Sequence, residues 1–497
     1  MRTATSQMSR EFADDPRAHE LVARLCSGGD ERLALDPQTG LNRYMSGPYP
    51  RDIVAYASST ANDISRDAFR HLLGQGRPAD GDYGALLEGM RGRLRGAFGL
   101  GGDVDVVFAP SGTDLEYVAL AATIDRSPGG VHNVLLGADE VGRGCVHSAA
   151  GRYFNDRTAP GRTVVPGESV PGLEAVSLTD IPVRCGRGLA RTSGQIAASI
   201  EGEIARARAG GRHALVHVVH GSKTGLILPA LDDLDRLLAR WGQAMTPVVD
   251  ACQVRLSPGD VAAYLDRGAI VLMTGSKFAG GVAFSGWALV PAALVRRAPP
   301  LPAGFDALFR RAEWPQGWNG REALPDRGNP GLATRLEGAL FELERFRALP
   351  ADAVSRVIDA FQRALRQGLV APLHLREVER SADPDPDTDT DTGQRAAPHA
   401  DLLATLATLD VSALPAARSF DGAVSLHARL ARGGIRLGQP VRSVRLPCGG
   451  WGGTLRLGLS MPQIAALAPL SQSACEAAFA AHFELVTEAL RQCEAVA

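Results

Sequence analysis

The stretch Pro247-Val248-Val249-Asp250-Ala251-Cys252-Gln253 is an apolar run that ends in a carboxylate. A second apolar run, Ile270–Met273, ends in Thr274-Gly275-Ser276-Lys277. Short apolar runs bounded by turn residues are typical of buried strands. In an open α/β sheet, ligands bind beyond the carboxyl ends of the strands. We therefore expect Asp250 and Lys277 to face one crevice from two strand ends.

Lysine is rare in this chain. Only Lys223 and Lys277 are lysines among the 53 Lys and Arg residues, which leaves 51 arginines. Arginine stays protonated, whereas a desolvated lysine can lose its proton and attack a carbonyl. We therefore interpret Lys277 as a catalytic residue. The alternative is that both lysines are ordinary surface residues.

A candidate anion site lies upstream of both motifs. Val104–Phe108 is predicted to be a strand, and it leads through Ser111, Gly112 and Thr113 into a helical stretch, Leu115–Ile124. A glycine-containing turn that opens a helix presents backbone N–H groups and a positive dipole end to an anion. The same turn is also an ordinary helix cap. Its place before Asp250 and Lys277 favours a phosphate cradle.

A phosphate cradle, an aspartate and a lysine in this order fit pyridoxal phosphate (PLP). The lysine would hold the cofactor aldehyde as a Schiff base. The aspartate would pair with the pyridine nitrogen and keep it protonated, so that the ring accepts electrons. The sequence therefore predicts a PLP site.

These motifs resemble those of the fold-type I PLP enzymes, in the branch of class V aminotransferases and cysteine desulfurases. The resemblance rests on residues 250–253 and 274–277 and covers roughly residues 60–490. It implies that Gln253 contacts the cofactor's 3′-oxygen and that Thr274 and Ser276 join the cradle around the phosphate. It also implies an α/β fold, with a mainly parallel seven-stranded sheet flanked by helices and a smaller α+β C-terminal domain.

Two positions depart from the family pattern beside the cofactor ring. Ser222 lies where the family has an asparagine, and a hydroxyl could still donate to the 3′-oxygen. Val141 follows Glu140 where the family has a histidine or aromatic residue that stacks on the ring. The stacking residue therefore stays unassigned, with His147 as one alternative.

Candidate substrate contacts come from both ends of the chain. In the predicted strand Thr454–Ser460, leucines alternate with other residues, so Arg456 lies on the face opposite the leucines. By resemblance, Arg456 binds the substrate α-carboxylate. Asn42 lies in a turn-rich segment that could touch substrate, although a packed loop is the alternative. Lys223 could meet a substrate carboxylate or phosphate, or be a solvated loop charge.

The chain of 497 residues is 45% hydrophobic, which is enough for a large core. We expect an N-terminal segment (1–60), a large PLP-binding domain (61–330) and a small C-terminal domain (331–497). Within the last of these, residues 380–399 repeat Asp, Pro and Thr. Such a segment has nothing to bury and is expected to be a disordered loop.

Composition also excludes several classes of protein. A net charge of −2 does not favour binding to nucleic acid or to a membrane. Seven scattered cysteines without a C-x-x-C pair suggest neither a metal site nor a disulfide framework. No apolar stretch approaches membrane-spanning length, and the first twenty residues lack an apolar run. We expect a cytoplasmic protein and, from the family's loop after the lysine, a homodimer.

The expected function is aminotransferase-like chemistry on a free amino acid. A carbon–sulfur lyase or desulfurase is the alternative, and a desulfurase needs a nucleophilic cysteine such as Cys448 before the Arg456 strand. A protein that binds PLP without turnover is a third alternative, because Val141 and Ser222 depart from the family pattern.

Overall fold

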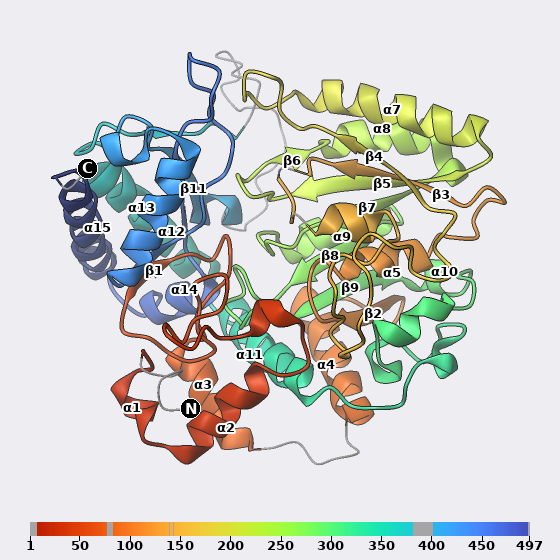
Figure 1. Cartoon of the computed structure of the whole chain (residues 1–497), viewed down its shortest axis with the longest axis horizontal. Helices are drawn as coiled ribbons and strands as arrows, with labels where there is room; N and C mark the ends of the chain where they lie inside the picture. Colours follow the sequence, from red (N-terminus) through yellow and green to blue (C-terminus); the bar gives the residue numbers. More distant parts are fainter. Residues whose placement is uncertain (1–6, 77–82, 139, 143, 381–400, 496–497) are drawn as a thin grey trace.

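The computed structural model describes residues 7–76, 83–138, 140–142, 144–380 and 401–495. Figure 1 shows a central sheet with helices on both faces at the right, and a second group of helices, α12, α13 and α15, at the left. The N-terminal helices lie below them. The acidic segment predicted to be disordered, residues 380–399, falls outside the described residues apart from Arg380.

The central sheet is mainly parallel, as predicted. Only β9 is antiparallel to its neighbours along the seven-stranded path, and the short β6 pairs antiparallel with β5 as an eighth strand. In spatial order the strands are β2 (Val104–Ala109), β9 (Gly286–Pro291), β8 (Ile270–Thr274), β7 (Met245–Asp250), β5 (His213–His220), β3 (Val131–Leu136) and β4 (Ser177–Ile181), with β6 (Ile227–Leu228) beside β5.

Both faces of this sheet are buried, which explains why its strands are nearly continuous apolar runs. Alternate residues of β2 point to opposite faces: Val106 and Phe108 belong to one core cluster, and Val107 and Ala109 to another. The first face is covered by α4 (Tyr83–Phe98), α7 (Ser193–Ala209), α8 (Leu231–Trp241), α9 (Pro258–Asp266) and α11 (Pro330–Arg347). The second face is covered by α5 (Leu115–Ala121) and by a loop-rich segment that contains Trp314 and Trp318.

A small antiparallel sheet forms in the C-terminal part of the chain, from β10 (Arg376–Glu377), β11 (Leu406–Asp410) and β13 (Thr454–Gly458). Four helices pack around it: α12 (Ala351–Leu365), α13 (Phe420–Arg432), α14 (Met461–Leu467) and α15 (Gln472–Ala495). None of the described helices is both long and apolar enough to cross a membrane.

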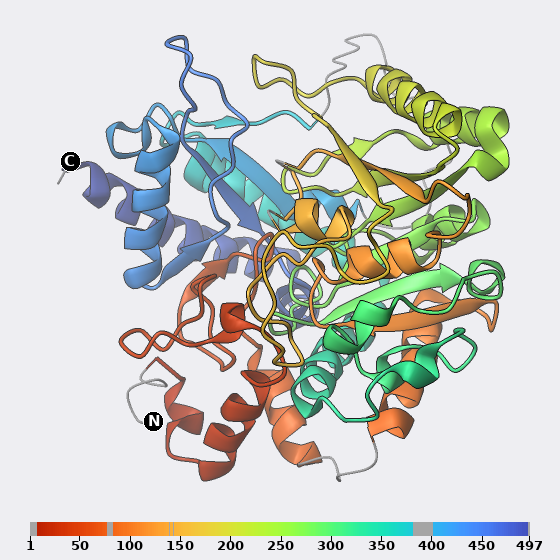
Figure 2. The same ribbon diagram turned by 45° about the vertical axis from the view of Figure 1, so that its right-hand side comes forward.

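The N-terminal segment contacts both other parts of the molecule. Strand β1 (Val54–Tyr56) pairs in parallel with β12 (Ile435–Leu437). The segment's helices α1 (Arg10–Ala13) and α2 (Pro16–Leu25) form an apolar cluster with α3 (Arg66–Gln75), which follows the segment, and Phe341 of α11 packs against this cluster. Figure 2 shows this segment below the C-terminal helices and beside the sheet. The boundaries predicted for the three domains stay a prediction.

Candidate cofactor and active site

Three predicted motifs meet at Cys252, just after the end of β7. The backbone N–H of Cys252 donates to Asp250 Oδ1 (3.0 Å), and its carbonyl accepts from Thr274 Oγ1 (2.8 Å). A Cβ atom at Gly112 would lie 3.0 Å from both Cys252 Sγ and Thr274 Cγ2. The cradle, the aspartate and the loop that ends in Lys277 therefore come together at the carboxyl ends of β2, β7 and β8.

The cradle is tightly bonded within itself. Ser111 Oγ donates to Asp114 Oδ2 (2.5 Å) and accepts from the backbone N–H of Asp114 (3.4 Å). Burial raises the pKa of Asp114 to about 6, against the effect of the nearby Arg32 charge. Helix α5 ends at Ala121, three residues earlier than predicted, so it has only about two turns. Side chains must therefore supply much of any attraction for an anion.

The loop that contains Lys277 is held from two sides. The backbone N–H of Asn62 donates to Ser276 O (3.2 Å), and its side-chain amide donates to the carbonyls of Ser276 (3.3 Å) and Lys277. On the other side, a Cβ atom at Gly275 would lie 2.4 Å from Ala339 Cβ on α11. Ser276 Oγ also donates to Thr274 Oγ1 (3.4 Å). Asn62 and α11 thus fix the position of the backbone that carries the Lys277 side chain.

The close approach of Gly275 to Ala339 leads to a stability prediction. Gly275→Ala is expected to lower the free energy of unfolding by about 1–3 kcal/mol, because α11 cannot move away without disturbing the core. Urea unfolding measures this change. Gly92→Ala on the exposed side of α4 is the matched control, since no atom lies within 4 Å of its added Cβ. A Gly275→Ala protein as stable as the control would contradict the packing described here.

Two residues predicted to touch the cofactor ring are engaged with protein groups. Ser222 Oγ donates to Glu140 Oε2 (2.8 Å), and this bond fixes the turn after β5. Gln253 donates through Nε2 to Ser59 O (3.2 Å), and its Oε1 accepts from Arg255. Both side chains are buried. Their contacts with a cofactor stay a prediction.

Asn42 organises its own loop. Its Oδ1 accepts from the backbone N–H groups of Tyr44 (2.9 Å) and Ser46 (3.2 Å) and from Ser46 Oγ (3.0 Å). This is the packed loop that the sequence offered as the alternative to substrate binding. A contact between Asn42 and substrate stays a prediction.

Arg456 on β13 is buried between the large sheet and the N-terminal segment. Its guanidinium donates to neutral oxygen atoms: Gln439 O (2.7 Å), Ser59 O (3.2 Å), Lys223 O (3.2 Å) and Thr60 Oγ1 (3.0 Å). None of the ion pairs between described residues involves Arg456. Burial lowers its pKa to about 10, so the group is still charged at neutral pH. A buried cation of this kind favours an anionic ligand.

Lys223 lies close to the same groups. Burial, together with the charges of Arg456 and Lys277, lowers the pKa of its amine to about 8, while Glu140 acts in the opposite direction. Glu140 itself is buried and paired with Arg184 (2.9 Å). Both lysines are only partly exposed, and a contact between Lys223 and substrate stays a prediction.

A buried acid–base pair lies near Asp250. His217 Nε2 on β5 is 3.4 Å from Glu116 Oε2 on α5, and neither atom has a hydrogen-bond partner among the described residues. Burial raises the pKa of Glu116 well above its usual value, and the charge of Asp250 adds to this shift. Burial lowers the pKa of His217 to about 4. Both shifts favour the neutral forms of the pair.

Cys145, like His217 and Glu116, is marked by no sequence motif. It begins α6 (Cys145–Ala149) and is buried, as is Val141, whereas His147 on the same helix is exposed. Burial raises the pKa of the Cys145 thiol to about 12, the charge of Asp250 acts in the same direction, and that of Lys277 opposes it. Cys145 thus lies among the charged groups of the site.

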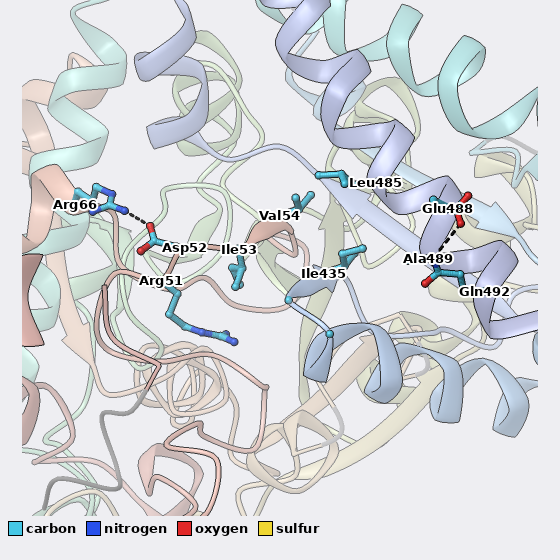
Figure 3. A pocket seen from close by; sticks show the side chains of 12 residues that line it. Arg51, Asp52, Ile53, Val54, Arg66, Ile435, Leu485, Glu488, Ala489 and Gln492 are labelled. Atoms are coloured by element: carbon cyan, nitrogen blue, oxygen red, sulfur yellow. Dashed lines mark hydrogen bonds and ion pairs between the residues drawn. The ribbon is translucent and has the colours of Figure 1, made fainter. Parts of the chain in front are cut away.

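A surface pocket of about 680 Å³ lies apart from these residues (Figure 3). It is lined by Val54 of β1, Ile435 of β12 and Leu485 of α15, with the Arg66–Asp52 ion pair at one side. None of the predicted site residues lines it. The described residues contain no cluster of three or more His, Cys, Asp or Glu side chains that could hold a metal ion.

Comparisons with known proteins establish the fold. No family model matches the sequence, and no curated protein matches it. Solved structures do match. A NifS-like protein from Rickettsia africae is 11% identical, with a TM-score of 0.55 over 89% of this chain and 99% of the other.

The structures of two enzymes with different activities match this chain with similar sequence identities and TM-scores. A cystine C-S lyase in complex with cysteine persulfide is 14% identical, with a TM-score of 0.52 over 87% of this chain and 98% of the other. A pyridoxamine-pyruvate aminotransferase from Mesorhizobium loti is 16% identical, with a TM-score of 0.51 over 89% of this chain and 99% of the other. The predicted fold-type I architecture of PLP enzymes is therefore confirmed.

Proposed function

We propose that this protein is a PLP-dependent enzyme that acts on an amino acid, with aminotransferase-like chemistry as its reaction. One observation supports this above all others. Gly112, Asp250 and the loop before Lys277 are far apart in the sequence, yet they meet around Cys252 at one edge of the sheet. This edge is where ligands bind in open α/β sheets.

The residues at this edge fit PLP. Gly112 keeps free a position that any side chain would fill, between Cys252 and Thr274. The two turns beside this position carry hydroxyl groups, and the carboxylate of Asp250 ends β7. We assign the cofactor to Ser111, Gly112, Thr113, Ser222, Asp250, Gln253, Thr274, Ser276 and Lys277.

Each residue has a defined task in this proposal. PLP, when bound, supplies an electron sink that stabilises negative charge at the Cα of an amino acid. Asp250 keeps a proton on the pyridine nitrogen. Lys277 would hold the cofactor through its amine, and the same amine, when free, would move the proton at Cα. Arg456 binds the substrate carboxylate and thereby orients the Cα–H bond.

Arg456 provides a test of substrate binding. Arg456→Gln is expected to raise the KM for an amino acid about 10- to 100-fold, because a charged hydrogen-bonded pair is lost. The KM for the corresponding amine, which lacks the carboxylate, should not change. Steady-state kinetics on both substrates measures the difference, with the exposed Arg442→Gln as the control. Equal effects on both substrates would indicate a structural role alone.

The proposed reaction is tested by supplying PLP, a panel of amino acids and a 2-oxo acid to the purified protein. Formation of a new amino acid from the 2-oxo acid is the expected result. Release of sulfide or pyruvate without transfer of the amino group would indicate that the protein is a lyase and not an aminotransferase. A spectral response to amino acids without any product would indicate a binding protein.

A carbon–sulfur lyase or desulfurase is the second candidate. The observation in its favour is that Cys448 is exposed in the loop before β13. An exposed thiol there could accept sulfur from a cysteine substrate. Loss of sulfur release in Cys448→Ala would support a desulfurase, and unchanged release would exclude a role for this thiol.

We also infer a homodimer in the cytoplasm. All seven cysteines are free, and Cys145, Cys252 and Cys475 are buried, which fits a reducing compartment. The glycine turn after Lys277 corresponds to the loop that approaches the partner subunit in the family resembled. Sedimentation analysis of the purified protein tests the dimer, and a monomer at all concentrations would contradict it.

A further inference from the structure

Arg32 joins the N-terminal segment to the predicted phosphate cradle. It lies in the short 3₁₀ turn Glu31–Leu33. Its Nη2 donates to Ser111 Oγ (3.3 Å), and its Nη1 donates to Thr113 Oγ1 (3.5 Å). Both hydroxyls belong to the cradle, about 80 residues further along the chain. No local sequence motif marks this arginine.

The guanidinium is held in place from several sides. Asp30 accepts from its Nε (2.9 and 3.0 Å) and Nη2 (2.6 Å), and also from the backbone N–H of Arg32 (3.0 Å). The rings of Phe284 and Phe154 lie 4.5 Å and 5.0 Å from the guanidinium carbon. The Arg32 side chain is 13% exposed. It is therefore oriented before any ligand binds.

The backbone of Phe284 contributes to this arrangement. Its φ angle is +73°, which is rare for a residue with a bulky side chain. Its carbonyl accepts from the buried Nε of Arg335 (2.7 Å), which holds the backbone in this conformation. Strained residues of this kind are concentrated at ligand sites. Here the strain brings an aromatic ring against the Arg32 guanidinium.

The charges around the cradle require a cation. Asp30 and Asp114 both lie beside it, and a phosphate between two carboxylates would be repelled. The Ser111 hydroxyl gives its proton to Asp114, so it cannot donate that proton to an anion as well. Asp30 occupies the Nε edge of Arg32 and leaves Nη1 directed at Thr113. Arginine is well suited to bind phosphate through such an edge.

We propose that Arg32 binds the phosphate group of the cofactor, so that the N-terminal segment forms one wall of the cofactor site. This inference rests on the proposed function and adds a residue to it. Phosphate bridges Arg32 of the N-terminal segment and the turn Ser111–Thr113 of the large sheet. Cofactor binding and docking of the N-terminal segment are then linked.

The test compares two ligands that differ only in the phosphate. The apoprotein is titrated with PLP and with pyridoxal, which lacks the phosphate, and the dissociation constants are measured for wild type and Arg32→Gln. Arg32→Gln is expected to weaken PLP binding about 10- to 100-fold and to leave pyridoxal binding unchanged. Arg32→Lys should give an intermediate loss for PLP, because it keeps the charge without the planar fork.

The chain contains a matched control. Asp15 and Arg17 repeat the geometry of Asp30 and Arg32: the backbone N–H of Arg17 donates to Asp15 Oδ1 (2.9 Å), and Nη2 pairs with Oδ2 (2.9 Å). The Arg17 side chain is 75% exposed. Arg17→Gln should therefore leave the affinities for both ligands unchanged.

The outcomes distinguish the role of Arg32 from the proposed function of the protein. Equal losses for PLP and pyridoxal in Arg32→Gln, or no loss for either, would overturn the role of Arg32 and leave the proposed function intact. Failure of the wild-type protein to bind PLP at all would overturn both. A selective loss of PLP affinity supports the direct contact, because a misfolded variant would also lose pyridoxal.

Discussion

Replacement of Lys277 by alanine is expected to abolish both turnover and the lysine-dependent visible absorption of the bound cofactor. We expect a loss of activity on the order of 10⁴-fold or more, because a methyl group can neither bond to the cofactor nor move a proton. Absorption spectra and single-turnover kinetics measure the two effects. The carbonyls of Ser276 and Lys277 that Asn62 binds are unchanged by the substitution, so the loop should keep its structure.

A second substitution at Lys277 separates the effect of its positive charge from the effect of its reactive amine. Lys277→Arg keeps the positive charge but not the ability to lose a proton, and it should fail as completely as Lys277→Ala. Lys223→Arg is the matched control, since Lys223 is the other lysine of the chain. It should retain the absorption band. A band that survives in Lys277→Arg and disappears in Lys223→Arg would reverse the assignment of the two lysines.

Asp250→Asn is expected to have the second largest effect, a fall in kcat of about 100- to 1,000-fold at saturating PLP. The amide keeps an oxygen that can accept from the Cys252 N–H, so the turn after β7 should be preserved. The negative charge that would hold a proton on the pyridine nitrogen is lost. Activity within about twofold of wild type would contradict the role of Asp250.

A control for this variant lies close by. Glu116 is a buried carboxyl group near Asp250, and its raised pKa favours the neutral form. Glu116→Gln therefore changes little of the local charge and should cost far less activity than Asp250→Asn. Urea unfolding of both variants shows whether either effect arises from stability.

The elements of the large sheet could be predicted from the sequence because burial on both faces produces continuous apolar runs. Val248 and Val249 lead directly to Asp250, and the observed strand ends at that residue. The strand before Lys277 likewise ends at Thr274. These two strand ends lie at the same side of the sheet, which is where the sequence predicts the site. The end of the helix after the cradle is less predictable, because Ala122 suits a helix but lies beyond its end at Ala121.

Contacts that join distant segments could not be predicted. Arg32 is one of 51 arginines, and nothing in its neighbours points to Ser111 or Thr113. Asn62 likewise lies in no motif, yet it binds the lysine loop, three residues before Ser65 caps α3. Such contacts depend on how the first 62 residues pack against the large sheet, and no periodic pattern encodes that.

Val141 and Ser222, the two residues that depart from the pattern the sequence resembles, both contact other protein groups. Val141 lies in a small apolar cluster with Cys145, and the residue that would stack on a ring stays unassigned. Ser222 binds Glu140, which also pairs with Arg184. These contacts form a buried network that only the three-dimensional arrangement reveals.

The most direct test of the central claim is to locate the lysine that holds the cofactor. The protein is loaded with PLP, reduced with sodium borohydride and digested, and the modified peptide is identified by mass spectrometry. We expect the cofactor to be attached to Lys277. Attachment to Lys223, or no attachment to either of the two lysines, would contradict the assignment of the active site.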